Sequence, residues 1–171
     1  MDYMPREIEA EFRATCAEYP VVLVTGVRQA GKSTMLEHFL GEGRRKVTLD
    51  DLEERALARE DPEFFLQTHR PPVLIDEVQY APELFSYIKI KVDNGAFPGS
   101  YWLTGSQSFR LMELAQESLA GRTAIVHMSA LSQAEMYGDH WSEPLSLQTD
   151  KLNIRKDHLA PCSSMEMYEI G

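Results

Sequence analysis

The chain has 171 residues, the size of one globular domain with a substantial hydrophobic core. Its net charge is −10, which argues against nonspecific binding to nucleic acid or anionic membranes, because such binding needs a basic surface. No apolar run approaches the ~18 residues of a membrane span, and the acidic, polar N-terminus is unlike a signal peptide. Cys16 and Cys162 form no C-x-x-C pattern, so we expect free thiols in a cytoplasmic protein.

In the first half of the chain, hydrophobic periodicity, caps and Gly/Pro breakers predict an alternation of helices and short strands. Val-Val-Leu-Val-Thr at 21–25 is typical of a buried parallel strand. The predicted elements are a helix over 5–18 with Pro5 in its first turn, the strand at 21–25, a helix over 33–40, a strand at 46–49, a helix from Asp51 through Leu57, and a short helix from Asp61. The basic run 44–46 is interpreted as a solvated loop.

The second half continues the alternation. Pro82 opens a helix whose i, i+4 apolar stripe faces a core and which ends at Asn94-Gly95. The other predicted elements are strands at 73–75, 101–103 and 124–128, a helix from Phe109, and a last short helix with a capping box at Ser132 and Glu135. Five strands with intervening helices predict a three-layer α/β domain with a parallel sheet.

Residues 26–33 match the phosphate-binding loop G-x-x-x-x-G-K-[ST] at every fixed position. A strand before it and a helix after it argue against a chance glycine turn. Lys32 is predicted to reach the β- and γ-phosphates, and Ser33 to bind Mg²⁺. The predicted nucleotide-binding residues are Gly26, Val27, Arg28, Gln29, Ala30, Gly31, Lys32, Ser33 and Thr34.

Asp76 and Glu77 follow the apolar strand at 73–75, which is the Walker B arrangement. Asp76 is predicted to hold Mg²⁺, largely through water, and Glu77 to orient and polarise the attacking water. The alternative is a pair of solvated carboxylates at a strand end, which the upstream phosphate loop disfavours.

The polar exit of the strand at 101–103 supplies candidates for a γ-phosphate sensor. Thr104, Ser106 and Gln107 all qualify, and the sequence does not rank them. Ser106 or Ser108 can also act as the N-cap of the helix that follows.

Five blocks together resemble one family: GVRQAGKST, VTLDD at 47–51, VLIDEVQYAPELFSYIKIKVD at 73–93, LTGSQSF at 103–109 and ESLAGR at 117–122. They are similar to the predicted AAA+-superfamily ATPases of bacteria and archaea whose ATPase domain precedes a C-terminal domain of uncharacterised function. The resemblance covers about residues 19–137. It implies the additional-strand (ASCE) fold with strand order 5-1-4-3-2, and ATP as the nucleotide. Arg122 is a candidate transition-state arginine, in cis or towards a neighbour, with a surface ion pair as the alternative.

We therefore expect a P-loop ATPase domain at 1–137 and an irregular tail at 138–171, without the C-terminal domain of the family. The leading hypothesis is a Mg²⁺-dependent ATP-binding protein and ATPase of AAA+ type. It would couple ATP or ADP binding to an unknown protein partner, and the oligomeric state is left open. The alternatives are a nucleotide-gated binding module without turnover and a small P-loop kinase. Glu77 favours hydrolysis over the kinase alternative, because a kinase has little need of a water-activating carboxylate.

Overall fold

The computed structural model describes residues 3–106 and 109–137. The chain divides into two compact units, residues 1–130 and 131–171. The predicted tail at 138–171 lies outside the described residues, so its irregular character stays a prediction. The first unit holds the sheet and every described residue of the candidate site.

The centre of the first unit is a five-stranded sheet in the order β2-β3-β4-β1-β5, with parallel pairing between all neighbours. This is the predicted order 5-1-4-3-2 read from the other edge, so the predicted topology is confirmed. The strands are β1 (Val21–Gly26), β2 (Arg45–Thr48), β3 (Val73–Asp76), β4 (Tyr101–Ser106) and β5 (Thr123–Met128). Because all strands are parallel, their carboxyl ends meet at one edge of the sheet.

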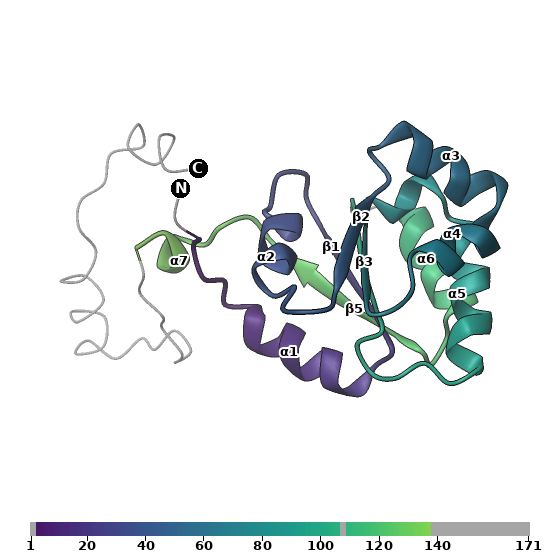
Figure 1. Ribbon diagram of the computed structural model, residues 1–171. Coiled ribbons are helices and arrows are strands. Elements are labelled where there is room, and N and C mark those ends of the chain that lie inside the picture. Colours follow the sequence, from purple (N-terminus) through teal and green to yellow (C-terminus); the bar gives the residue numbers. More distant parts are fainter. Residues whose placement is uncertain (1–2, 107–108, 138–171) are drawn as a thin grey trace, which may run out of the picture. The chain divides into compact units, whose positions relative to one another are not determined.

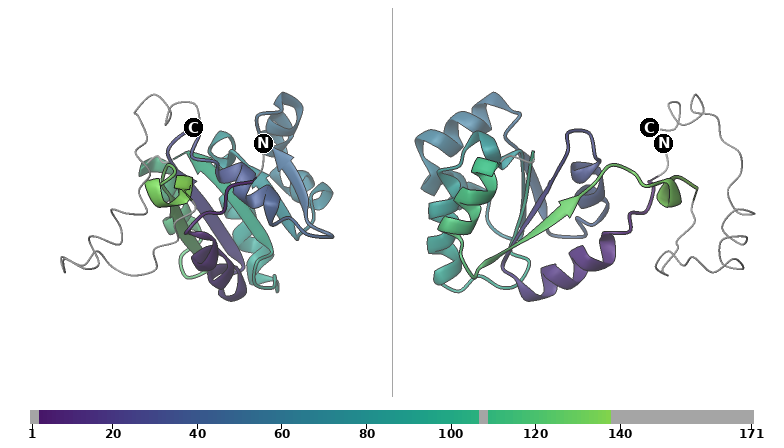
Figure 2. Two further views of the ribbon diagram at one scale, coloured as in Figure 1. Left: turned by 90° about the vertical axis from the view of Figure 1, so that its left-hand side faces the viewer. Right: turned by 180° about the vertical axis from the view of Figure 1, so that it is seen from behind.

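Helices cover both faces of this sheet, which gives the predicted three layers (Figure 1). One face carries α1 (Glu9–Glu18) and α2 (Lys32–His38). The other face carries α3 (Leu52–Glu60), α4 (Pro62–Thr68), α5 (Leu84–Asp93) and α6 (Phe109–Ser118). Figure 2 shows the same separation of the two helix groups from two further directions.

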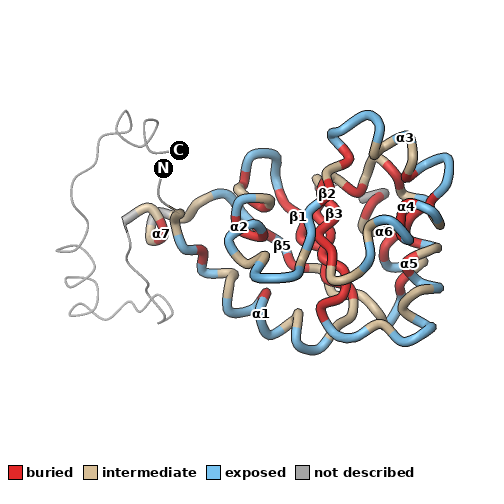
Figure 3. The backbone as a smooth tube through the Cα atoms, viewed as in Figure 1, coloured by how far each residue is buried: buried red, intermediate tan, exposed pale blue. Residues whose placement is uncertain are grey.

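The residues of β1 alternate between two hydrophobic clusters, one on each face of the sheet. Val21 and Leu23 pack into the cluster beneath α3–α6, whereas Val22 and Val24 pack into the cluster beneath α1 and α2. Every residue of β1 is buried, and the three central strands β1, β3 and β4 form the buried centre of Figure 3. A strand covered on both faces needs a continuous apolar run, which explains the apolar sequence within residues 21–25.

Several predicted boundaries differ from the structure: the helix predicted through Leu57 ends at Glu60, for example. Two of the differences have a clear physical reason. The first helix begins at Glu9 rather than near Pro5, because the backbone N–H of Arg6 donates to Glu9 Oε1 at 2.7 Å and the preceding segment is not helical. Strand β4 does not end at Leu103. It continues through Ser106, because parallel pairing with β1 extends to the pair Gly26 and Ser106.

Several predicted caps are confirmed. Asp51 accepts hydrogen bonds from the N–H groups of Glu53 and Glu54, and Asp61 accepts one from Phe64 N–H. In the second unit, α7 (Gln133–Tyr137) begins with the reciprocal capping box of Ser132 and Glu135, at 2.7 and 3.1 Å. Over the described ranges, none of the helices combines the length and the apolar character needed to cross a bilayer.

Candidate nucleotide-binding site

The predicted phosphate loop joins the carboxyl end of β1 to the start of α2. Its backbone is tightly wound: Gly31 has φ 85° and Gln29 has φ 64°, both in the left-handed region. Gly26 is required for a different reason, since a Cβ atom there would lie 2.0 Å from the carbonyl oxygen of Met128 on the neighbouring strand. The glycines of the motif therefore serve loop curvature at one end and close strand packing at the other.

Lys32, the motif lysine, is folded against its own loop. Its side chain is buried, and Nζ donates to the carbonyl oxygens of Gly26 at 3.2 Å and Val27 at 2.9 Å. These partners are backbone dipoles rather than a carboxylate. The positive charge of Lys32 is thus held inside the loop by neutral carbonyl oxygens.

Ser33, Asp76 and Thr104 meet at the carboxyl ends of the central strands. Ser33 Oγ donates to Asp76 Oδ1 at 2.7 Å, and Thr104 Oγ1 donates to the same oxygen. Asp76 is only 6% exposed, so hydroxyl donors replace most of the water around its carboxylate. The structure therefore brings the two predicted metal ligands, Ser33 and Asp76, into direct contact.

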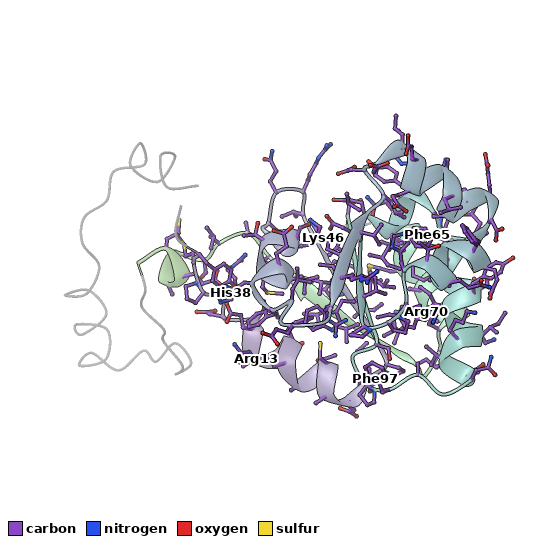
Figure 4. The ribbon with its side chains drawn as sticks, viewed as in Figure 1. Arg13, His38, Lys46, Phe65, Arg70 and Phe97 are labelled. Carbon is purple, nitrogen blue, oxygen red and sulfur yellow. The ribbon has the colours of Figure 1, made fainter. Side chains whose placement is uncertain are left out.

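Lys46 is a charged neighbour of this carboxylate that the motifs did not reveal. It is a residue of the edge strand β2, and its side chain forms an ion pair with Glu37 of α2 (Figure 4). Its Nζ lies 3.5 Å from Asp76 Oδ2. Burial lowers the pKa of Lys46, but its hydrogen bonds and charge interactions with Glu37 and Asp76 outweigh burial and raise that pKa above its usual value. The sequence signal that could have indicated this role is the position of Lys46 on β2, the strand that pairs with the Walker B strand β3.

The prediction of a solvated loop at 44–46 is therefore wrong. Residues 45–48 form β2, and Arg44 packs with its guanidinium 3.6 Å from the centre of the Trp102 ring. Arg44 also donates to Gly99 O at 2.7 Å, and burial lowers its pKa to about 10. Within the run 44–46, Arg44 packs on Trp102 and bonds to Gly99, whereas Lys46 places a positive charge near Asp76.

Glu77, the predicted water-orienting carboxylate, directly follows β3 in a left-handed conformation, with φ 60° and ψ 44°. Its backbone N–H donates to Thr104 Oγ1 at 3.0 Å. Its carboxylate accepts a hydrogen bond from the side-chain amide of Gln79, in the short 3-10 turn η1 (Val78–Tyr80). Thr104 thus contacts both Walker B residues, through Asp76 Oδ1 and Glu77 N.

Of the two sensor candidates that the structure describes, Thr104 and Ser106, Thr104 has the more direct contact with the site. Ser106 contacts Gln79 through its backbone N–H rather than through its hydroxyl. Gln107 lies outside the described residues, as does Ser108, so their sensor and capping roles stay predictions. We regard Thr104 as the candidate that the geometry favours.

Arg122 is not brought together with the other site residues. Its carbonyl oxygen accepts a hydrogen bond from Val21 N–H at the start of β1, whereas the phosphate loop follows the end of that strand. Its side chain pairs with Asp93 and donates to Ala120 O at 3.0 Å. The placement favours the surface ion pair over a role in cis, and a role towards a neighbouring molecule stays a prediction.

Arg6 is a second residue that the sequence reasoning missed. Its buried guanidinium donates to Ala30 O at 2.7 Å and to Ser129 O at 2.8 Å, which ties the N-terminal segment to the phosphate loop and to the chain after β5. By contrast, Val27, Arg28 and Gln29 are exposed. Their predicted contacts with nucleotide stay predictions.

Comparison with known proteins agrees with this geometry. The chain belongs to the AAA domain family, whose model matches residues 18–137. It is 38% identical over 130 residues to the uncharacterized protein Rv2008c of Mycobacterium tuberculosis and, to the same extent, to the uncharacterized protein Mb2031c of Mycobacterium bovis. The match covers 74% of this chain and 29% of each relative, so the chain spans less than a third of their length.

The fold resembles a solved ATPase. The Walker-type ATPase PABY2304 of Pyrococcus abyssi superposes with a TM-score of 0.52 at 17% sequence identity, covering 94% of this chain and 61% of that one. At this identity the likeness establishes the fold and nothing finer. The family and the fold together define a P-loop ATPase domain.

Proposed function

We propose that this chain binds ATP with Mg²⁺ and hydrolyses it, as an ATPase of AAA+ type. The observation that carries the proposal is the contact of Ser33 Oγ with Asp76 Oδ1 at 2.7 Å, with Lys32 in the adjoining loop. A hydroxyl and a carboxylate in this relation are the protein ligands that P-loop enzymes use for Mg²⁺.

The loop residues supply the phosphate-binding part. Lys32 donates to two neutral carbonyl oxygens, and a phosphate oxygen, which is anionic, is a stronger acceptor for an ammonium group. A modest rotation of the Lys32 side chain away from Gly26 O and Val27 O would exchange these partners for the β- and γ-phosphates. Such a local positive charge is needed in a protein whose net charge is −10.

The donor set fits magnesium. Ser33 and Asp76 offer hard oxygen ligands, and Mg²⁺ is commonly held by one or two protein oxygens together with phosphate oxygens and water. Ser33 and Asp76 would hold the ion, whose positive charge would offset the negative charge that develops during phosphoryl transfer. Thr104 orients Asp76 through its hydrogen bond to Oδ1.

Glu77 is the candidate residue that orients and polarises the attacking water. Its backbone is fixed by Thr104 and its carboxylate by Gln79, so its position is determined by β3 and β4 together. A carboxylate held beside the phosphate site can accept a hydrogen bond from water and raise its nucleophilicity. This distinguishes hydrolysis from kinase chemistry, which needs no water-activating group.

We further propose that nucleotide state is coupled to a protein partner, as in other AAA+ proteins. The match covers 29% of each mycobacterial relative, which leaves room in those proteins for further domains. A nucleotide-gated binding module without turnover is the alternative that shares the same site.

The direct experiment measures ATP binding and phosphate release by the purified chain, with Mg²⁺ and with excess chelator. We expect binding and phosphate release with Mg²⁺ and a loss of release with chelator. Binding without release would support the alternative module, and the absence of both would reject the nucleotide site. A parallel assay with GTP tests the choice of base, which rests on family resemblance.

A further inference from the structure

Gln79 links Glu77 to the end of β4 through both ends of its side-chain amide. Its Nε2 group donates to Glu77 Oε2, and its Oε1 atom accepts a hydrogen bond from Ser106 N–H at 3.3 Å. The amide can satisfy both partners at once because it carries a donor and an acceptor on one rigid plane. The bond to Ser106 fixes which end of the amide faces Glu77.

The backbone of Glu77 is held in a conformation that other residues rarely adopt. The left-handed region is sterically unfavourable for a residue with a Cβ atom, so surrounding contacts must stabilise it at Glu77. The bond from Glu77 N–H to Thr104 Oγ1 at 3.0 Å is one such contact. With its backbone fixed, Glu77 keeps only side-chain rotations, and the bond from Gln79 restricts these.

The packing around β4 leaves space for Gln79. A Cβ atom at Gly105 would lie 3.0 Å from Gln79 Oε1 and 2.4 Å from Leu111 Cδ2 of α6. The absence of a side chain at Gly105 therefore lets Gln79 and α6 approach the same stretch of β4. This makes the contact between Gln79 and β4 part of the core packing rather than a chance surface bond.

We propose that Gln79 is a positioning residue that holds the Glu77 carboxylate for water activation and couples its orientation to the end of β4. The inference rests on the proposed function and identifies the residue that orients the water-activating carboxylate of that same site. Gln79 takes up no proton in the reaction: its amide donates to Glu77 Oε2 and leaves Oε1 to accept a hydrogen bond from water. Loss of this donor frees the carboxylate to rotate and lowers the fraction of complexes in which the water is aligned.

Three substitutions separate this role from a general effect on folding. Gln79→Leu removes both hydrogen bonds, and Gln79→Glu keeps the shape and an acceptor for Ser106 but places like charges together. Gln67→Leu is the matched control, because Gln67 makes the same kind of amide–carboxylate bond, to Glu63, on the exposed surface of α4. We expect kcat to fall roughly ten- to hundred-fold in both Gln79 variants, with ATP affinity within about two-fold of wild type and no change in Gln67→Leu.

A double-mutant cycle with Glu77→Gln tests whether Gln79 acts through Glu77. We expect the double variant Glu77→Gln, Gln79→Leu to be no slower than Glu77→Gln alone, since residues that act as a unit are not additive. Multiplied effects would overturn the inference. So would a Gln79→Leu enzyme that keeps wild-type kcat.

A spectroscopic measurement keeps the inference separate from the proposed function. In ¹⁵N-labelled protein, the side-chain amide signal that disappears in Gln79→Leu identifies Gln79. We expect this signal to move when Glu77 is changed to Gln. If the signal does not move, the pairing of Gln79 with Glu77 is overturned, whatever the turnover. If the signal moves but the wild-type protein releases no phosphate, the pairing is supported and hydrolysis is rejected as the function.

Discussion

Ser33 donates a hydrogen bond to Asp76 at 2.7 Å, although the two residues are 43 positions apart in the chain. One begins the helix after the phosphate loop and the other ends the strand β3. Their contact is possible because β3 and β1 are both parallel to β4, which lies between them in the sheet. The sheet topology thus converts two separate motifs into one candidate metal site.

Asp76→Asn should remove most of the contribution of Mg²⁺ to ATP affinity. The amide keeps the size of the side chain and can still accept from Ser33 and Thr104, but it removes the charge that attracts the ion. We expect the affinity gain on adding Mg²⁺, measured with a fluorescent ATP analogue, to fall roughly ten-fold or more. The control is Asp93→Asn, which removes a carboxylate paired with Arg122 and should leave the gain unchanged. An Asp76→Asn protein with the full gain would show that the ion binds elsewhere.

Lys32→Ala should abolish ATP binding while the chain stays folded. Its side chain donates to two loop carbonyls, so truncation costs only about 1 kcal/mol of stability for each bond lost, whereas a charge-assisted contact with phosphate is lost outright. Circular dichroism and titration with labelled ATP measure the two effects separately. The control is Lys91→Ala, which breaks the ion pair between Lys91 on α5 and Glu63 on α4. Submicromolar ATP affinity in Lys32→Ala would refute the assignment of the phosphate loop.

We expect the thiol of Cys16 to lower the free energy of unfolding of the chain as the pH rises above 9. Burial raises the pKa of this thiol to about 11, while the positive charge of the nearby Arg44 opposes that rise. Between pH 9 and 11 the unfolded thiol ionises and the folded thiol does not, so the unfolded state is favoured progressively and stability present below pH 9 is lost.

The measurement is the melting temperature of the chain between pH 8 and pH 11, in a Cys162→Ser background that removes the second thiol. We expect the decrease over this range to be smaller in Cys16→Ala than in its parent. Equal decreases would mean that Cys16 titrates in the same range in both states.

Residues 138–171 should be dispensable for nucleotide binding. The described site residues all lie between Gly26 and Ser106, and the family match ends at residue 137. A chain ending at Tyr137 should therefore bind Mg²⁺–ATP with an affinity within a few-fold of the full chain. A shortened chain that is folded by circular dichroism but has lost ATP binding would mean that the tail contributes to the site.

The parts of the site that the sequence predicted are those encoded in contiguous motifs. The phosphate loop could be recognised because its glycines and lysine lie within eight positions, with a strand and a helix on either side. The strand order followed from family resemblance, and it determined that Lys32, Ser33, Asp76 and Glu77 share one edge of the sheet.

The residues that the sequence did not reveal act through contacts between distant segments. Arg6 reaches the phosphate loop from a segment before α1, and Lys46 reaches Asp76 from the neighbouring strand. Neither has a spacing that marks its role, because an arginine near an N-terminus and a lysine on an edge strand are ordinary surface residues in most chains. Gln79 lay inside a recognised block, but its link to Ser106 depends on the close approach of η1 and β4.

The most direct test of the account compares ATP binding and turnover in wild type and Glu77→Gln. The amide preserves the size of the side chain but cannot act as a base, so Mg²⁺–ATP affinity should stay within a few-fold of wild type while phosphate release falls roughly a hundred-fold or more. Glu53→Gln, a change on the exposed surface of α3, is the control and should behave as wild type. Wild-type turnover in Glu77→Gln would contradict the account, because the water would then be positioned by another group.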